Sequence, residues 1–201
     1  LVQAQADSPA RVVEAAAEAL GGKARIQAVR SITIAGYGQI GNQNGGGNID
    51  ANPSAPQKLV NIGGAVRNID LANGRMRLTQ TQTHDFVFAY ERNMRGIRVD
   101  QRLDGDIAFN IGANGRPQRL GEGAVRGRRL EMLNNPISLV RAALDPAAKL
   151  SNLRTDRATG TQVVTVTTAK GDVLEVAFNA TTKLPAWVSW VQPDPNLGEV
   201  T

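Results

Sequence analysis

The stretch TQVVTVTTAKGDVLEVAFNATTKLPAWVSWV, residues 161–191, decides the fold class of this chain. Its apolar residues alternate with polar or smaller ones, so that Leu174, Val176 and Phe178 share one face of an extended segment. Such period-two alternation of β-branched and aromatic residues, interrupted by turns that contain Gly or Asn, is typical of strands. The stretch therefore predicts an antiparallel meander of three strands, at residues 161–168, 173–178 and 184–191.

Upstream of this meander, residues 31–111 repeat a strand–turn–strand pattern. The pair Asn73-Gly74 and the sequence Asp104-Gly105-Asp106 are both typical of hairpin turns. The glycine-rich segment 41–57 predicts a surface loop or hairpin tip. These segments predict further strands of one antiparallel sheet, which the meander extends.

Two helical zones interrupt the strands. Ser8 and Pro9 are a favoured N-cap and first residue for an N-terminal helix, which Gly21-Gly22 ends. The second zone covers residues 123–144 and stops at Asp145-Pro146. The order helix, strands, helices, strands predicts an α+β fold. We expect a large curved antiparallel β-sheet, similar to half of a barrel, with the N-terminal helix and the central helical segment covering one face.

Length and composition predict a single domain, and the first residues of the sequence predict export. A chain of 201 residues, 41% of them hydrophobic, is long enough for one buried core, which we assign to residues 7–201. Residues 1–6, LVQAQA, end in the small-x-small pattern of a signal-peptidase site. We interpret them as the tail of a signal peptide or a disordered N-terminus, and we expect a periplasmic protein of the bacterial cell envelope. No run of about 18 apolar residues is present, so no transmembrane helix is expected.

The inventory of reactive side chains argues against catalysis. The sequence has no cysteine and one histidine, His84, so it lacks the ligand sets that are typical of catalytic zinc. Asp104 and Asp106 could begin a calcium loop, but no glutamate closes it, and a hairpin turn is favoured. The pair His84-Asp85 is interpreted as a solvated turn. We expect no enzyme activity, no metal and no other cofactor.

Arginine dominates the basic residues and suggests a binding role. The net charge is +5, and arginine supplies 18 of the 23 basic residues. Two clusters stand out: Arg92, Arg95, Arg98 and Arg102, and then Arg126, Arg128 and Arg129. Each cluster is either a solvated face or a surface that docks onto an acidic protein or lipid headgroups. Nucleic acid is not expected, because the few aromatic residues are not interleaved with the basic ones.

Two tryptophans, Trp187 and Trp190, fall on opposite faces of the last strand of the meander. One of them can belong to the core, and the other is then exposed or covered by a helix or a partner. Large amphipathic aromatic side chains often anchor interfaces. The predicted partner-binding residues are therefore Arg92, Arg95, Arg98, Arg102, Trp187 and Trp190.

Four motifs together resemble a known family. They are ALGGKARIQAV at residues 19–29 before a strand, DLANGR at 70–75, LDGDIAFN at 103–110, and NATTKLP at 179–185 before a tryptophan-bearing strand. The set resembles the N-terminal, non-metal domain that precedes the catalytic domain in some exported bacterial metallo-β-lactamase-fold hydrolases. The last motif also resembles the outer-membrane lipoprotein-carrier superfamily, whose fold is a half-open antiparallel sheet with helices in its concavity.

The resemblance implies an accessory role. The hydrolase motif His-x-His-x-Asp-His is missing, because this chain has a single histidine. We expect a docking domain that serves as an accessory subunit on the outer face of a membrane protein complex. Two alternatives stay open: a lipoprotein-carrier-like module that holds an acyl chain between sheet and helices, and the accessory N-terminal domain of a secreted metallo-hydrolase.

Overall fold

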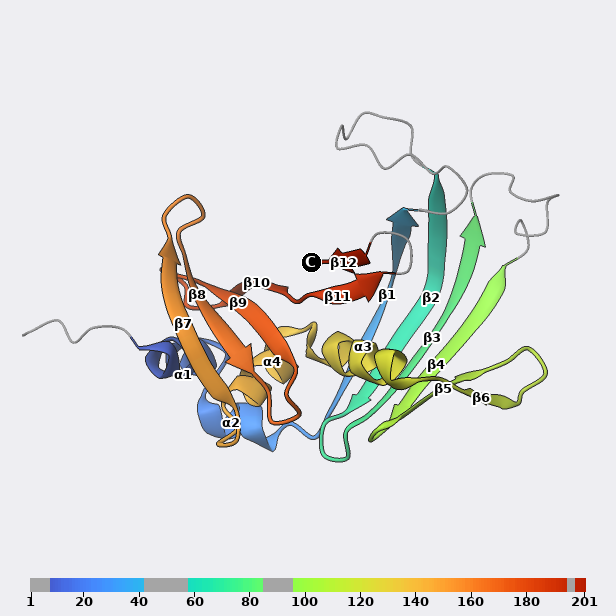
Figure 1. Cartoon of the computed structure of the whole chain (residues 1–201), viewed down its shortest axis with the longest axis horizontal. Coiled ribbons are helices and arrows are strands. Elements are labelled where there is room, and N and C mark those ends of the chain that lie inside the picture. The colour runs from blue at the N-terminus through green and yellow to red at the C-terminus, as the bar shows by residue number, and fades with distance from the viewer. Residues whose placement is uncertain (1–7, 42–57, 85–95, 195–197) are drawn as a thin grey trace, which may run out of the picture. The chain divides into compact units, whose positions relative to one another are not determined.

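The computed structural model describes residues 8–41, 58–84, 96–194 and 198–201 (Figure 1). In these ranges the chain forms antiparallel sheets and four α-helices. The chain divides into two compact units. The central unit comprises residues 31–128, and the terminal unit comprises residues 1–30 and 129–201.

The central unit is built on a six-stranded antiparallel sheet. Its strands are β1 (Ser31–Gly41), β2 (Leu59–Asp70), β3 (Arg75–His84), β4 (Ile97–Asp104), β5 (Ile107–Ile111) and β6 (Pro117–Arg119). Each strand pairs with the next along the chain. Tight turns allow this meander: Gly74 and Gly105 have φ values of +63° and +58°, which a residue without a Cβ atom adopts at little steric cost.

The two faces of this sheet differ in character. Residues that lie directly opposite each other in antiparallel strands share a face. The registers of β2 to β5 place four buried apolar residues in one row: Ile69, Met76, Leu103 and Ala108. Helix α3 (Glu122–Leu133) begins in this unit, where its Val125 is also buried. The opposite face of the sheet carries the charged residues of the candidate site.

The terminal unit packs helices against a smaller sheet. Its other elements are α1 (Pro9–Ala19), α2 (Lys23–Ala28), α4 (Pro136–Ala143), β7 (Lys149–Asp156), β8 (Thr161–Thr167), β9 (Val173–Asn179), β10 (Pro185–Ser189), β11 (Gln192–Asp194) and β12 (Gly198–Val200). Strands β7 to β10 form a four-stranded antiparallel sheet, and β11 pairs with β12. The core joins buried residues of α1, α2 and α4 to Val164, Val176 and Phe178 on the inner face of the four-stranded sheet.

Polar side chains stabilise the ends of the helices in the terminal unit. Ser8 Oγ accepts a hydrogen bond from the backbone N–H three residues on, and Pro9 is the first residue of α1, as the sequence predicts. The Arg141 guanidinium of α4 donates to the carbonyl oxygens of Ile26 and Val29 at the C-terminal end of α2, where the Ile26 carbonyl also accepts from the N–H of Val29. Across the described ranges, no helix combines the length and the apolar character that spanning a bilayer requires.

The predicted α+β class with a large antiparallel sheet is confirmed, and the large sheet is open. The strands of residues 161–191 do not extend it, however, because β8, β9 and β10 belong with β7 to a separate sheet. The helices α3 and α4 stand between β6 and β7 in the chain, so no hairpin joins the two sets of strands. The single domain over residues 7–201 stays a prediction.

Val176→Asp should unfold the terminal unit, because the Val176 side chain is fully buried on the inner face of β9. An unpaired carboxylate in a core costs several kcal/mol, comparable with the ~5–15 kcal/mol stability of a whole domain. Glu175→Ala, one residue away on the other face, removes a half-exposed ion pair with Arg154 and should have a small effect. Urea melts measure the difference, and an equal loss of stability in both variants would show that the strand register is wrong.

Candidate functional site

The candidate site lies on the charged face of the six-stranded sheet. Arg98 and Arg102 occupy the same face of β4, with Asp100 between them, as the sequence predicts. The pairing of β3 with β4 adds Arg77, which lies directly opposite Arg102. The face that carries Arg75, Arg77, Arg98 and Arg102 is called the arginine face below.

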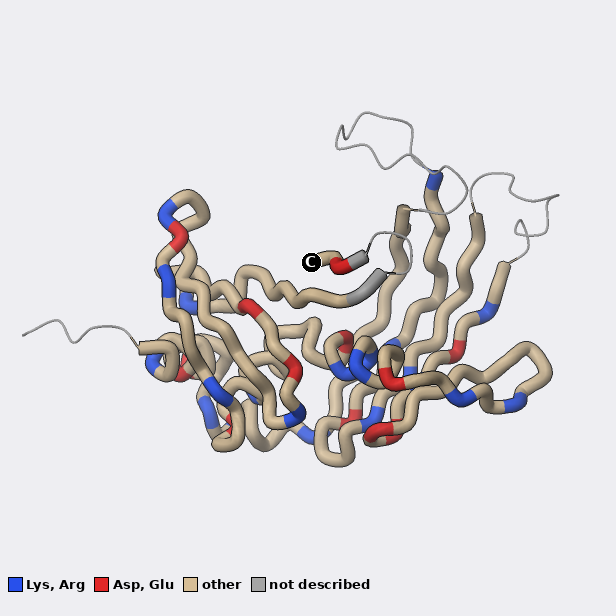
Figure 2. The backbone as a smooth tube through the Cα atoms, viewed as in Figure 1, with Lys and Arg blue, Asp and Glu red and all other residues tan. Residues whose placement is uncertain are grey.

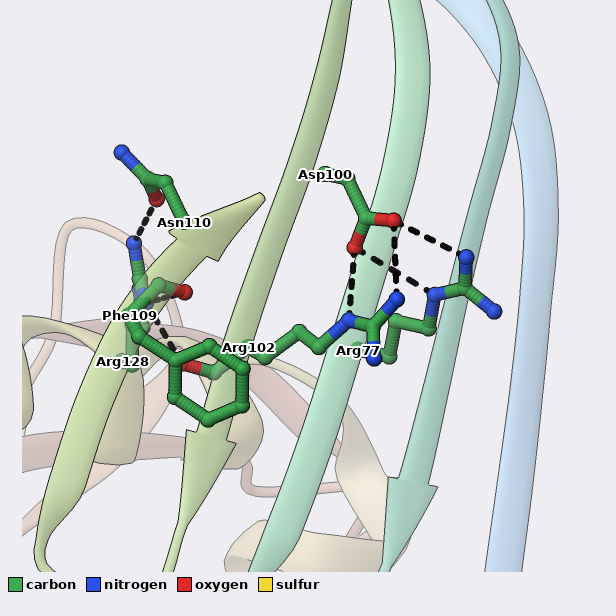
Figure 3. Close-up of polar contacts among 6 residues, drawn as sticks. All are labelled: Arg77, Asp100, Arg102, Phe109, Asn110 and Arg128. Atoms are coloured by element: carbon green, nitrogen blue, oxygen red, sulfur yellow. Dashed lines mark hydrogen bonds and ion pairs between the residues drawn. The ribbon is translucent and has the colours of Figure 1, made fainter. Parts of the chain in front are cut away.

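At the centre of the arginine face, two guanidinium groups hold the Asp100 carboxylate (Figure 3). Arg102 donates from Nε to Oδ1 at 2.9 Å and from Nη2 to Oδ2 at 3.1 Å. Arg77 donates to the same two oxygens, from Nε at 3.3 Å and from Nη2 at 2.9 Å. The side chain of Asp100 is 6% exposed, whereas those of Arg77 and Arg102 are 45% and 34% exposed. Two bidentate pairs, the strong form of a charged hydrogen bond, thus converge on one buried carboxylate.

The two guanidinium groups keep Asp100 ionised. The hydrogen bonds from Arg102 have the largest effect and lower the pKa of Asp100, whereas burial raises it. The hydrogen bonds from Arg77 and the positive charges of both arginines lower the pKa further. The pKa of this carboxyl therefore lies well below its usual value. Asp100 in turn raises the pKa of Arg102. The three side chains form a cluster of two cations and one anion that stays charged at physiological pH.

An open depression of about 580 Å³ adjoins this cluster. Its lining combines Arg77 and Arg102 with polar residues of β1 and β2 and with the half-buried Phe109. At its border, Arg75 and Asp104 form an exposed ion pair at 2.7 Å. The depression is a surface feature, unlike the enclosed apolar clefts that hold most small-molecule ligands.

The second arginine cluster is partly built into the fold. Arg128 is buried and donates to backbone carbonyl oxygens of β4 and β5 and to the side chain of Asn110 (Figure 3). Arg129 forms a bidentate pair with the buried carboxylate of Asp172. The sequence predicts either a solvated face or a docking surface for this cluster. Both predictions are wrong for Arg128, because its guanidinium is buried and donates hydrogen bonds to carbonyl oxygens of the sheet.

The two tryptophans differ in exposure. Trp190, just after β10, packs against the core of the terminal unit, and its Nε1 donates to Gln192 at 3.1 Å. Trp187 lies opposite Ala177 on the other face of the sheet, is 37% exposed and borders a groove of about 350 Å³. The partner-binding role of both residues stays a prediction.

The other residues singled out in the sequence either lie in strands and turns of the central unit or fall outside the described ranges. Arg92 and Arg95, predicted as partner-binding residues, lie outside the described residues. His84 is the last residue of β3 rather than part of a turn. Asp104 ends β4 and Gly105 turns the chain toward β5, so this sequence is the predicted hairpin turn. In the part of the chain that the structure describes, no three His, Asp or Glu side chains are grouped to hold a metal ion.

No protein-family model matches the sequence, and no curated protein matches it significantly. Function is therefore argued from the site and not from the fold. The arginine face offers guanidinium donors that are fixed in position by hydrogen bonds. Such donors suit carboxylate and phosphate groups, which accept two parallel hydrogen bonds from one guanidinium.

The stability contributed by Asp100 should depend on pH in a defined direction. Because the folded pKa lies below the unfolded value of about 4, the contribution is complete above that pH and declines as the pH falls toward the folded pKa. Asp100→Asn should therefore be less stable than the wild type at neutral pH, and the gap should narrow by about 1.4 kcal/mol per pH unit below about pH 4. Urea melts at several pH values measure this gap. A gap that does not change with pH would contradict the assignment of the charged network.

Proposed function

We propose that this chain is a non-catalytic, exported binding domain that docks through its arginine face onto an acidic protein surface. The observation that carries the proposal is the Arg77–Asp100–Arg102 network, in which a buried carboxylate orients two exposed guanidinium groups on an open sheet. Loose surface arginines would lose side-chain entropy when a partner binds. Arginines that are already ordered lose less, so this face is suited to specific docking.

The charge distribution supports an acidic partner. Residues 31–128 contain twelve basic and eight acidic residues, whereas the rest of the chain contains eleven basic and ten acidic residues. The net charge is therefore +4 (12 − 8) for residues 31–128 and +1 (11 − 10) for the rest, so most of the net positive charge belongs to the central unit, which bears the arginine face. Figure 2 marks the described Lys and Arg residues in blue and the described Asp and Glu residues in red. A concentrated charge of one sign steers a partner of the opposite sign and raises the association rate.

The compartment and the type of partner belong to the same proposal. The pattern Ala4-Gln5-Ala6 favours export to the periplasm, where a membrane protein complex could present an acidic outer face. In that setting the chain acts as an accessory subunit. The resemblance to the non-metal domain of exported metallo-β-lactamase-fold hydrolases supports an accessory role and stays part of the proposal.

Reversal of two exposed arginines should abolish docking without loss of the fold. Arg75→Glu with Arg98→Glu changes the arginine face but leaves Asp100 and its two partners intact. We expect the variant to recover much less partner from solubilised envelope membranes at low salt. We also expect wild-type recovery to fall steeply as salt shortens the Debye length to about 8 Å. Association kinetics and pull-down yields are the measurements.

The matched control is Arg154→Glu with Arg157→Glu in the terminal unit. It reverses the same number of charges, again at one arginine of an exposed ion pair and at one further exposed arginine, which lies in a turn for Arg157 and on β4 for Arg98. This control should dock as the wild type does. Equal recovery of every partner by both double variants would refute docking through the arginine face. Binding to anionic vesicles with no protein recovered would instead favour lipid headgroups.

A further inference from the structure

We propose that Arg77, Asp100 and Arg102 form a clamp for one carboxylate of an acidic protein segment, with Asp100 as the positioning residue. The inference rests on the docking proposed above and names the chemical group that the arginine face recognises. It requires unused donors on the two arginines, a place for the segment, and a reason why the network is more than a structural ion pair. The structure addresses each requirement.

The donors remain available on both arginines. A guanidinium has five N–H groups in a planar fork. Asp100 occupies the edge formed by Nε and Nη2 in Arg77 and also in Arg102. The other edge, formed by Nη1 and the second N–H of Nη2, has no acceptor among the described residues for either arginine. Each arginine can therefore hold Asp100 with one edge and a second carboxylate with the other.

The depression beside the network provides a place for the bound segment. It places Thr33, Asn68 and Phe109 near the two arginines. Thr33 donates to Oδ1 of Asn68 at 2.9 Å, so the amide nitrogen of Asn68 remains as a further donor. Phe109 supplies an apolar wall. An acidic side chain can thus reach the guanidinium groups while a neighbouring apolar residue of the same segment contacts Phe109.

The charges around the depression favour a carboxylate over a phosphate. The network has a net charge of +1, and the nearby Arg75 and Asp104 neutralise each other. The Asp70 carboxylate accepts hydrogen bonds within its own turn, from Asn73 and Ala72, and stays ionised because those bonds lower its pKa. A monovalent carboxylate therefore neutralises the network, whereas a phosphate dianion exceeds its charge and meets repulsion from Asp70.

Stability alone does not account for this arrangement. Exposed ion pairs contribute little to stability, and a buried carboxylate loses hydration that its partners only partly replace. The Arg75–Asp104 and Arg154–Glu175 pairs each join one arginine to one carboxylate, with both groups about half exposed. Arg129 likewise forms a bidentate pair with the buried carboxylate of Asp172. Asp100 differs because its buried carboxylate spans two arginines that lie opposite each other on neighbouring strands of one sheet face. This geometry fixes two guanidinium groups side by side at the surface, which is what recognition of a carboxylate requires.

Substitutions that preserve or raise the positive charge provide the test. The probe is a short fluorescein-labelled polyglutamate peptide, with a polyglutamine peptide as its uncharged match, and binding is followed by fluorescence anisotropy at low salt. Arg77→Lys with Arg102→Lys keeps the charge but removes both forks, and the clamp predicts binding about tenfold weaker. Asp100→Asn makes the face more positive but releases both arginines, and the clamp again predicts weaker binding. Thermal melts verify that each variant is folded.

The outcomes separate the clamp from the docking proposal. If the lysine variant binds as the wild type does and Asp100→Asn binds more tightly, the clamp is wrong, because net charge alone then decides binding. Docking through the arginine face would still stand if Arg75→Glu with Arg98→Glu weakened binding. If inorganic phosphate displaces the peptide at concentrations where chloride of equal ionic strength does not, the assignment to a carboxylate is overturned. If Asp100→Asn fails to fold, Arg77→Lys with Arg102→Lys still decides between the clamp and net charge, because unchanged binding by that variant contradicts the clamp.

Discussion

A carboxylate can stay ionised out of contact with water only while hydrogen-bond donors surround it, and this requirement organises the arginine face. Asp100 meets it by taking two donors from each of Arg77 and Arg102. The two guanidinium groups in turn cover the carboxylate and become ordered. If Asp100 were removed, both arginines would be free to adopt many rotamers. The face would keep its positive charge, but its guanidinium groups would no longer be held in fixed positions.

The two units of the chain differ in how the faces of their sheets are used. The terminal unit buries helices against one face of its sheet and has a continuous apolar core, with Val176 and Phe178 at its centre. The central unit buries the row that contains Ile69 and Met76 on one face of its sheet and leaves a charged face on the other. An antiparallel sheet tolerates this asymmetry, because alternate residues serve the two faces independently. A charged and ordered sheet face is therefore available for recognition.

Local patterns in the sequence predict the fold class and part of the site. Alternation at residues 161–191 predicts strands, and the even spacing from Arg98 to Arg102 places both arginines on one face. The sequence does not reveal that Arg77 joins them, because that contact depends on the register between β3 and β4, and residues 85–96 separate the two strands in the chain. The register also creates the burial of Asp100.

Non-local contacts explain the other differences between prediction and structure. The sequence does not distinguish Arg128 from the nearby Arg126 and Arg129, yet Arg128 is buried where its guanidinium reaches carbonyl oxygens of β4 and β5. The separation into two sheets is likewise invisible to strand periodicity, which specifies the faces of a strand but not its partner. The alternate placement of Arg75 and Arg77 in β3 and of Arg98, Asp100 and Arg102 in β4 is a signal that could have suggested a charged face, although not the contacts within it.

The most direct test of the account observes the arginine side chains by proton–nitrogen NMR at neutral pH. The Nε–H groups of Arg77 and Arg102 donate to Asp100, so their signals should exchange slowly with water. Arg98, for which the described residues provide no acceptor, should exchange rapidly and serves as the internal reference. The account predicts that Asp100→Asn abolishes the protection of both slow signals together. Signals of Arg77 and Arg102 that exchange as fast as that of Arg98 in the wild type would contradict it.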